Sequence, residues 1–278
     1  MNKCLAGLGL AIAWFGVTTV GAAQLPERIK SAGKVTVATQ PVYPPMEYKD
    51  PATGELKGLD IDLGRALAKQ LGVEVNWSET AFEQIIPAVT TGRADLVHSG
   101  MSDLPKRREA LDFLDYMKSG PQFYSVVSRK DDFRTPADLC GKTIGMSRVT
   151  LFPDQATKWS AQNCEASGKP PIVIFGTQSS ADARTQLRQG RVDAVVQGAE
   201  TLPFLMGQEK DTYLLIGEPF DHVYQGIGFA KGAPGLRDSY AAAFRVLMEN
   251  GEYRKILASH GLEALALDGV YINGERVK

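Results

Sequence analysis

The sequence predicts an α/β fold of two lobes, each with a mainly parallel sheet flanked by helices. Amphipathic helices alternate with short apolar strands along most of the 278 residues, the order that places helices on the faces of a parallel sheet. One unit, a helix followed by a glycine and a strand, occurs twice, as GRADLVHSG from Gly92 and as GRVDAVVQG from Gly190. In a chain long enough for two sizeable cores, this repeat indicates two lobes of related construction. A chance recurrence of a common unit is the alternative.

The N-terminal 23 residues have the order of segments that is typical of a secretory signal peptide. Lys3 gives a short positive start, Leu5 to Val20 is almost wholly apolar, and small residues precede Gln24. The apolar run is short for a membrane span, which disfavours an uncleaved anchor. We expect cleavage after Ala23 and a mature protein in the periplasm.

The first elements of the mature chain can be assigned in order. Residues 35–39 alternate as a strand, and a proline-rich loop follows. The segment GLDIDLGRALAKQLG, residues 58–72, has its apolar residues at helical spacing and ends on a glycine, a good helix stop. Its Asp60 and Asp62 lie in the first turn, where carboxylates complement the helix dipole. Residues 73–77 alternate as the next strand.

The same alternation continues along the chain. Thr80 and Glu83 have the spacing of a capping box for the next helix. A buried strand begins at Leu96, a further helix is expected from about Pro105, and residues 111–113 form another strand.

Composition and charge exclude several classes of partner. Hydrophobic residues make up 44% of the chain and charged residues 23%, with a formal net charge of −1. The longest basic run is Lys106 to Arg108, too short for nucleic acid or an anionic membrane to be the main partner. With three histidines and no CxxC, we expect neither a metal site nor a cofactor.

The position of a ligand site follows from the repeated unit. In an open α/β sheet, ligands bind beyond the carboxyl ends of the strands. His98-Ser99-Gly100 and Gln197-Gly198 both occupy that position, so a cleft between two facing lobes is expected.

Several ordered segments resemble one family, the periplasmic solute-binding proteins for polar amino acids that serve ABC importers. The similarity runs from about Lys34 to Leu262, and GLDIDLGRALAKQLG is its most specific match. Further matches, in the family's order, are VTVATQPVYPPMEY, AFEQIIPAVTTGRADLVHSGMSDLPKRREALDFLDY, DLCGKTIGM, GRVDAVVQG and YQGIGFAKGAPGLRDSYAAAFRVLMENGEYRKI. The resemblance implies the type II periplasmic-binding-protein fold, with two crossover strands between the lobes.

The resemblance also implies domain boundaries. After the signal peptide at 1–23, lobe 1 would comprise residues 24–119 and 225–278, and lobe 2 residues 120–224. A ligand would close the cleft between them.

The loop after the first repeat offers groups for a carboxylate. Ser99 and Ser102 carry hydroxyls, the amides around Gly100 are expected to point into the cleft, and the helix expected from Pro105 would add positive potential. Arg107 adds a planar, always charged fork. The resemblance assigns the ligand α-carboxylate to Arg107, rather than to its basic neighbours.

The resemblance further implies that Tyr43 and Phe82 sandwich the apolar part of the ligand, although Phe82 could instead anchor its helix in the core. The predicted ligand-binding positions are Tyr43, Phe82, Ser99, Gly100, Met101, Ser102, Arg107, Arg148, Thr150, Gly198 and Glu200.

The chain departs from the family where the α-ammonium is usually met. Gln40 and Gly198 stand at positions that usually carry acids, and an ammonium buried without a carboxylate is costly. Either Glu200 replaces the missing acid, or the ligand has a carboxylate and lacks a free α-ammonium. Arg148 raises the further option of a second anionic group.

We therefore expect a monomeric receptor for an amino acid or a related small carboxylate, working with the membrane permease of an ABC importer. A sensory receptor would use the same binding chemistry. An exported dehydratase of the same fold, similar to cyclohexadienyl dehydratase, is the enzymatic alternative, with Glu200 as general acid and His98 across the cleft. No paired carboxylates, Ser-His-Asp set or metal-ligand spacing supports catalysis.

Cys140 and Cys164 remain after removal of the signal peptide, and an even pair in an exported protein predicts a disulfide. Closing a loop of this length stabilises the fold by roughly 3 kcal/mol in the chain-entropy account. Mass spectrometry of the exported, unreduced protein should find no alkylatable thiol. Two alkylated cysteines would reject the bridge.

Overall fold

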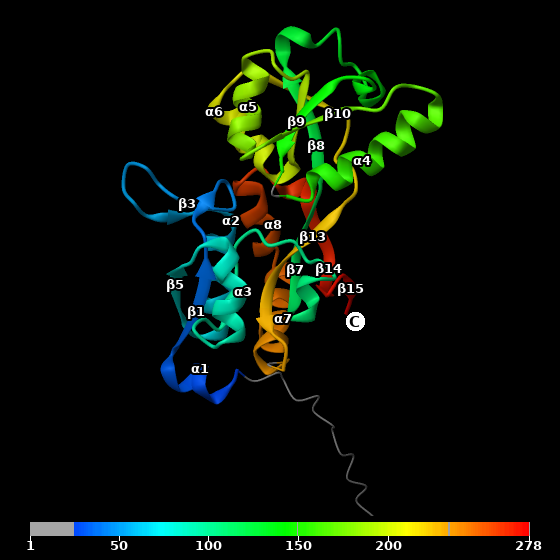
Figure 1. The fold of residues 1–278 in the computed structure, drawn as a ribbon. Coiled ribbons are helices and arrows are strands. Elements are labelled where there is room, and N and C mark those ends of the chain that lie inside the picture. Colours follow the sequence, from blue (N-terminus) through cyan, green and yellow to red (C-terminus); the bar gives the residue numbers. More distant parts are fainter. Residues whose placement is uncertain (1–24, 149, 233, 278) are drawn as a thin grey trace, which may run out of the picture.

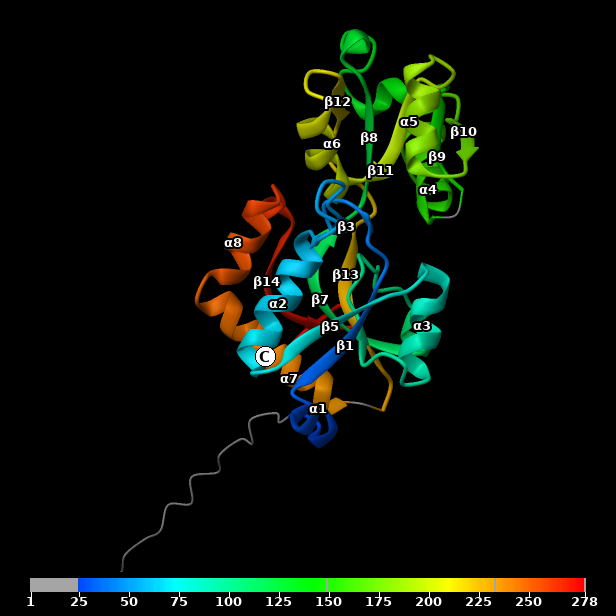
Figure 2. The same cartoon turned by 90° about the vertical axis from the view of Figure 1, so that its left-hand side faces the viewer.

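Two large sheets lie at opposite ends of the molecule in the computed structural model (Figure 1), which describes residues 25–148, 150–232 and 234–277. The expected signal peptide lies outside the described residues. Figure 2 shows that helices cover both faces of each sheet and that few segments connect the two ends. The α/β fold predicted from the sequence is confirmed.

The larger sheet has seven strands in the order β15-β14-β7-β13-β6-β1-β5. β1 pairs in parallel with β5 and β6, whereas β6, β7, β13 and β14 pair antiparallel, so the sheet is mixed rather than mainly parallel. Its strands are β1 (Lys34–Thr39), β5 (Glu74–Glu79), β6 (Leu96–Val97), β7 (Leu111–Ser119), β13 (Val223–Ala230), β14 (Ala266–Ile272) and β15 (Glu275–Arg276).

Helices cover both faces of this sheet. One face packs on a core shared by α1, α2, α7 and α8, and the other packs on α3. The helices are α1 (Glu27–Ala32), α2 (Leu59–Leu71), α3 (Phe82–Thr90), α7 (Pro234–Glu249) and α8 (Glu252–Ser259). A small antiparallel sheet of β2 (Val42–Tyr43), β3 (Glu47–Lys49) and β4 (Leu56–Lys57) projects toward the other end of the molecule.

The second sheet has five strands in the order β10-β9-β11-β8-β12 and is also mixed. β9 pairs in parallel with β10 and β11, and β8 pairs antiparallel with β11 and β12. Its elements are β8 (Pro121–Val126), β9 (Thr143–Ser147), α4 (Phe152–Asn163), β10 (Val173–Thr177), α5 (Ser180–Arg188), β11 (Ala194–Gly198), α6 (Leu202–Gln208) and β12 (Tyr213–Ile216).

Two crossovers join the sheets. β7 ends at Ser119 and β8 begins at Pro121, so one strand pair runs almost without a break from one end of the molecule to the other. β13 returns beside it, with Val223 opposite Ser119. The antiparallel pairs of the larger sheet involve β7, β13 and β14, and those of the smaller sheet involve β8, so crossover strands contribute to the mixed pairing of each. The domain boundaries expected from the sequence stay a prediction.

The repeated unit performs the same structural task in both sheets. After α3, Asp95 accepts a hydrogen bond from the backbone N–H of Thr36 in β1 at 2.7 Å and pairs with Arg28 at 2.5 Å. After α5, Asp193 accepts from the N–H of Thr143 in β9 at 2.8 Å and pairs with Arg129 at 2.7 Å. The recurrence is therefore a structural repeat and not a chance similarity.

The disulfide predicted from the cysteine pair is confirmed. Cys140 and Cys164 are bonded, with their Cα atoms 5.5 Å apart, and the bridge joins the loop before β9 to the end of α4. Cys164 is fully buried in the core of the five-stranded sheet.

Two local predictions are wrong. α3 begins after Ala81 with no side-chain cap, because the Thr80 hydroxyl donates to the carbonyl of Ser78 instead. The helix expected from Pro105 is only a 3-10 turn, Arg107–Glu109, because the chain enters β7 at Leu111.

A buried carboxyl in β7 should make stability depend on pH. Burial and, second, repulsion from Asp103 raise the pKa of Asp115 to about 8. This pKa exceeds the value of ~3.9 for aspartate in the unfolded chain. The protonated Asp115 therefore makes its full contribution to the free energy of unfolding below pH ~4, and that contribution is lost as the pH rises toward the folded pKa of about 8.

We predict that the free energy of unfolding of Asp115→Asn increases relative to that of the wild type as the pH rises from 4 to 8. The difference should reach ~1–3 kcal/mol at pH 8. Asparagine keeps an acceptor for the Gly274 N–H, which bonds Asp115 at 2.8 Å. Urea unfolding at several pH values measures the difference, with the exposed Asp131→Asn as control. A difference that does not change with pH would contradict the prediction.

Candidate ligand-binding cleft

A cavity of about 480 Å³ lies between the two sheets, and both contribute to its wall. The crossover segment Ser119–Pro121 and β13 form its base. The predicted positions that line it are Tyr43, Phe82, Ser99, Gly100, Ser102, Arg107, Thr150, Gly198 and Glu200.

Two predicted positions lie elsewhere. Met101 is 1% exposed and packs in the core beneath α3, because the positive φ of 50° at Gly100 turns the next side chain away from the cleft. Arg148 is exposed and outside the cavity wall. Its charge helps to lower the pKa of Asp182, after that residue's hydrogen bonds. Among the described residues that line the cavity, Arg107 is therefore the one Lys or Arg available to an anionic ligand group.

Arg107 presents its guanidinium to the cavity with no acidic partner among the described residues. It donates to the Ser102 carbonyl at 2.8 Å and lies 5.4 Å from the centre of the Phe82 ring. Burial lowers the pKa of this group, but a guanidinium stays protonated at physiological pH. A half-buried cation held by a neutral carbonyl and a ring can accept a carboxylate.

The two neighbouring basic residues do not share this role. Arg108 donates twice to the Asp103 carboxylate, at 2.5 and 2.7 Å, and is therefore neutralised. Lys106 is exposed. Of the three adjacent cations, Arg107 alone lines the cavity.

The loop at 99–100 is held from behind by two buried carboxyl groups. The Ser99 hydroxyl donates to Glu47 at 2.8 Å and accepts from the N–H of Gln40 at 2.9 Å. The Gly100 N–H donates to Asp60 at 2.6 Å. It is therefore not free for a ligand, and the prediction that this amide points into the cleft is wrong. Asp60 is fully buried, and it fixes this loop rather than only complementing the dipole of α2.

Glu200 brings a carboxylate from the five-stranded sheet into the cavity wall. It is 3% exposed and accepts hydrogen bonds from three neutral donors. These are the Tyr43 hydroxyl at 2.5 Å, the Gln225 amide at 3.0 Å and the Ser119 hydroxyl. No Lys or Arg of the described segments pairs with it, so its charge is available to a cationic ligand group.

Gly198 and Glu200 form one structural unit. A Cβ added at Gly198 would collide with the Glu200 carboxylate. The glutamate therefore fills the space of a side chain at position 198, where the family pattern has an acid. The reading in which Glu200 replaces the missing acid is supported by this geometry.

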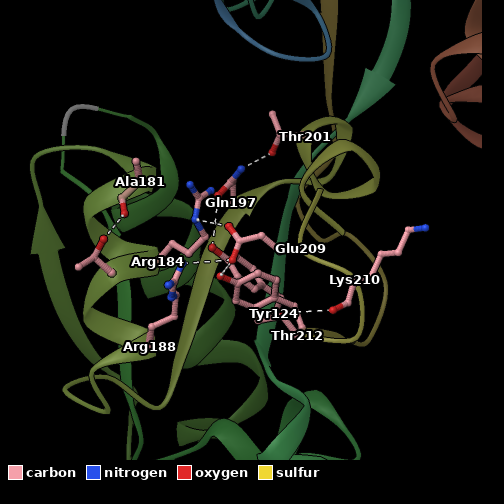
Figure 3. Close-up of polar contacts among 11 residues, drawn as sticks. Tyr124, Ala181, Arg184, Arg188, Gln197, Thr201, Glu209, Lys210 and Thr212 are labelled. Carbon is pink, nitrogen blue, oxygen red and sulfur yellow. Dashed lines mark hydrogen bonds and ion pairs between the residues drawn. The ribbon is translucent and has the colours of Figure 1, made fainter. Parts of the chain in front are cut away.

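The strand end that bears Glu200 is anchored by a polar network (Figure 3). Gln197 donates to Thr201 at 2.5 Å and accepts from the Tyr124 hydroxyl at 3.4 Å, and Thr201 donates to the carbonyl of Gly198 at 2.8 Å. Further along, Glu209 binds Arg184, Arg188 and Tyr213. These contacts tie the start of α6 to β11 and its end to α5 and β12, next to the turn that bears the Glu200 carboxylate.

Burial shifts the pKa of one group that contacts Glu200 and of another that lies behind the loop at 99–100. Burial and, second, the Glu200 charge raise the pKa of Tyr43 well above its usual value, so its hydroxyl remains a donor. Burial lowers the pKa of His98, which is 1% exposed and lies behind the loop, outside the cavity wall.

Sequence reasoning missed part of the wall. Ser119 and Gln225 lie on the crossover strands, and Gln155 and Gln178–Ser180 lie on the five-stranded side. The sequence offered only a weak signal for these lining residues, namely a serine or glutamine next to apolar residues of a predicted strand. Their convergence depends on how the crossovers return, which no local pattern encodes.

Residues 35–263 match the sequence profile of the bacterial extracellular solute-binding proteins, family 3. The chain belongs to this family. It is 32% identical to an arginine-binding protein of Corynebacterium glutamicum over 90% of this chain and 82% of the relative. It is 28% identical to the histidine-binding periplasmic protein of Salmonella typhimurium over 92% of this chain and 95% of that protein.

Solved structures agree with the fold of this solute-binding protein. An ancestral amino acid-binding protein, a precursor of cyclohexadienyl dehydratase, matches with a TM-score of 0.69 and 27% identity over 84% of this chain and 97% of that one. Within the described residues, no helix is long and apolar enough to span a membrane, and no cluster of three potential metal ligands occurs.

We predict that Arg107→Ala weakens ligand binding by ~2–5 kcal/mol, because it leaves the ligand carboxylate buried without a partner. Isothermal titration calorimetry measures the change, and the exposed neighbour Lys106→Ala serves as control. An affinity within twofold of the wild type would show that the carboxylate binds elsewhere.

Proposed function

We propose that this solute-binding protein is the periplasmic receptor of an ABC importer and that its ligand is a free amino acid with a cationic side chain, arginine first. One observation carries the choice of a free amino acid: the cavity wall holds the Arg107 guanidinium without an acidic partner and, on the other sheet, a Glu200 carboxylate bonded to neutral donors. A solute with both charges satisfies both groups. The choice of a cationic side chain rests on the names of the arginine- and histidine-binding relatives.

Binding would couple the two sheets. Arg107 lies on the seven-stranded side and Glu200 on the five-stranded side, so a ligand that contacts both stabilises the closed arrangement of the lobes. We assign residues 24–119 and 225–278 to lobe 1 and residues 120–224 to lobe 2, with the crossovers near Ser119 and Val223 as hinges. The closed monomer would then dock on a membrane permease.

A binding role is favoured over the dehydratase role. Glu200 accepts three hydrogen bonds and uses both of its carboxylate oxygens in them, so the geometry does not place it as a general acid toward a ligand. His98 lies buried behind the loop instead of across the cleft, so the proposed acid and base partners do not face a common ligand. The relatives reported above are all named as binding proteins.

We predict tight binding of L-arginine in calorimetry and weaker binding of L-glutamine, which has no side-chain charge. Glu200→Gln should weaken arginine binding roughly 10- to 100-fold, since a charged hydrogen bond contributes ~1.5–3 kcal/mol. The exposed Glu218→Gln is the matched control.

Two outcomes would contradict the proposal. If no cationic amino acid binds, native mass spectrometry of the purified protein should reveal a different co-purified solute. If arginine binds Glu200→Gln as tightly as the wild type, Glu200 is not its partner, and a ligand without a free ammonium becomes the better choice.

A further inference from the structure

Behind the loop at 99–100 lies a buried group of four side chains, which we call the acid cluster: Glu47, Asp60, His98 and Tyr116. They come from β3, α2, the end of β6 and β7, and each is at most 2% exposed. No ion pair joins a Lys or Arg to either carboxyl group in the part of the chain that the structure describes. The cluster therefore has no fixed cation to balance two buried negative charges.

Each member of the acid cluster has one buried polar atom without a hydrogen-bond partner. These atoms are Glu47 Oε2, Asp60 Oδ1, His98 Nε2 and the Tyr116 hydroxyl. The other oxygens of the two carboxyl groups are used, since Glu47 Oε1 accepts from Ser99 at 2.8 Å and Asp60 Oδ2 accepts from the Gly100 N–H at 2.6 Å. The two carboxyl groups lie within hydrogen-bonding reach of each other, and two carboxyl oxygens can bond to each other only if one of them carries a proton.

The surrounding groups leave the carboxyl pair as the place for that proton. Two adjacent ionised carboxylates in a buried site repel strongly. Burial and, second, the charge of Asp60 raise the pKa of Glu47 well above its usual value. His98, with its nitrogen 3.6 Å from Asp60 Oδ1, is held neutral by burial, and Tyr116 is kept protonated by burial and the Asp60 charge. On the cavity side, Tyr43 and Glu200 add no positive charge.

We propose that Glu47 and Asp60 share one proton between Oε2 and Oδ1, and that this pair fixes the Ser99 hydroxyl as a hydrogen-bond acceptor for the ligand's α-ammonium. Glu47 reaches the cavity wall, but its Oε1 is occupied by the Ser99 hydroxyl. Glu47 is then a positioning residue, because it acts on the ligand through Ser99. The part that concerns the ligand rests on the proposed function; the shared proton does not.

The role of Ser99 follows from the hydrogen-bond capacity of a hydroxyl. Ser99 has one hydrogen, which it donates to Glu47, and two lone pairs, one of which accepts from the N–H of Gln40. The remaining lone pair can only accept. Ser99 lines the cavity, so it suits an ammonium rather than the carboxylate that the sequence assigned to it. It supplies an acceptor close to Gln40, where the family's usual acid is missing.

Stability without ligand tests the shared proton. Glutamine at position 47 reproduces the protonated glutamate, with an oxygen for Ser99 and an N–H for Asp60. A folded pKa above the unfolded value of ~4.3 means that wild-type stability is complete below that pH and is lost as the pH rises through the folded pKa.

The folding equilibrium constant of Glu47→Gln should therefore rise relative to the wild type by up to ~tenfold per pH unit above pH ~4.3. The folding equilibrium constant of Asp60→Asn should change with pH in the same way. Its amide oxygen can accept from the Gly100 N–H while its N–H donates to Glu47. Chemical unfolding between pH 4 and 8 measures the ratio. A ratio that does not change with pH would overturn the shared proton.

Arginine binding at pH 7 tests the effect on Ser99. Glu47→Gln should bind at least tenfold more tightly than Glu47→Leu, which removes the acceptor that orients the hydroxyl. The double variant Glu47→Gln/Asp60→Asn places two amide N–H groups opposite each other and should bind more weakly than either single amide variant. If the leucine variant does not fold, the comparison of the double amide variant with the single amide variants tests the positioning role by itself.

Equal affinities for the single and double amide variants would overturn the positioning role. If arginine does not bind the wild type, the proposed function fails, whereas the pH dependence of unfolding still decides whether the proton is shared.

Discussion

One buried carboxylate, that of Glu200 on the five-stranded side, receives hydrogen bonds from the opposite side of the cleft and from its base. Tyr43 comes from the small sheet, Ser119 from the end of one crossover strand and Gln225 from the other. The same carboxylate occupies the space that a side chain at Gly198 would need. The position of the glutamate, the glycine before it and the neutral donors around it are therefore one interdependent arrangement, and a charged group so enclosed needs a full set of donors.

The ligand preference of the site depends on two groups of opposite charge, Arg107 and Glu200, that have no charged partner among the described residues. Arg107 faces the cavity with a carbonyl and an aromatic ring for neighbours, while adjacent Arg108 is neutralised by Asp103. A buried charge is stabilised by a partner of opposite sign far more than by neutral dipoles. The cleft is consequently suited to a small solute that carries both charges, and the acid cluster behind the loop explains how a serine can serve where the family has an acid.

Much of the fold could be predicted, because it depends on patterns within single segments. Helical spacing located α2, the repeated unit located α3 with β6 and α5 with β11, and the cysteine pair gave the disulfide. Predictions failed where a local signal had a distant competitor. The Thr80 hydroxyl donates to a backbone carbonyl instead of capping a helix. The antiparallel pairing of β7 with β13 joins residues about a hundred positions apart, which no local pattern predicts.

The sequence by itself determined the α/β class, the structural repeat, the disulfide and the residue types available for a charged ligand, since periodicity and composition report local burial. Only the tertiary structure decided that Asp103 neutralises Arg108, that Met101 faces the core, and that the single hydrogen of Ser99 is already used by Glu47. Each of these depends on a partner far away in the chain or on the exact turn of a loop. Hydrogen bonds and ion pairs act over a few ångströms, so only the folded chain selects their partners.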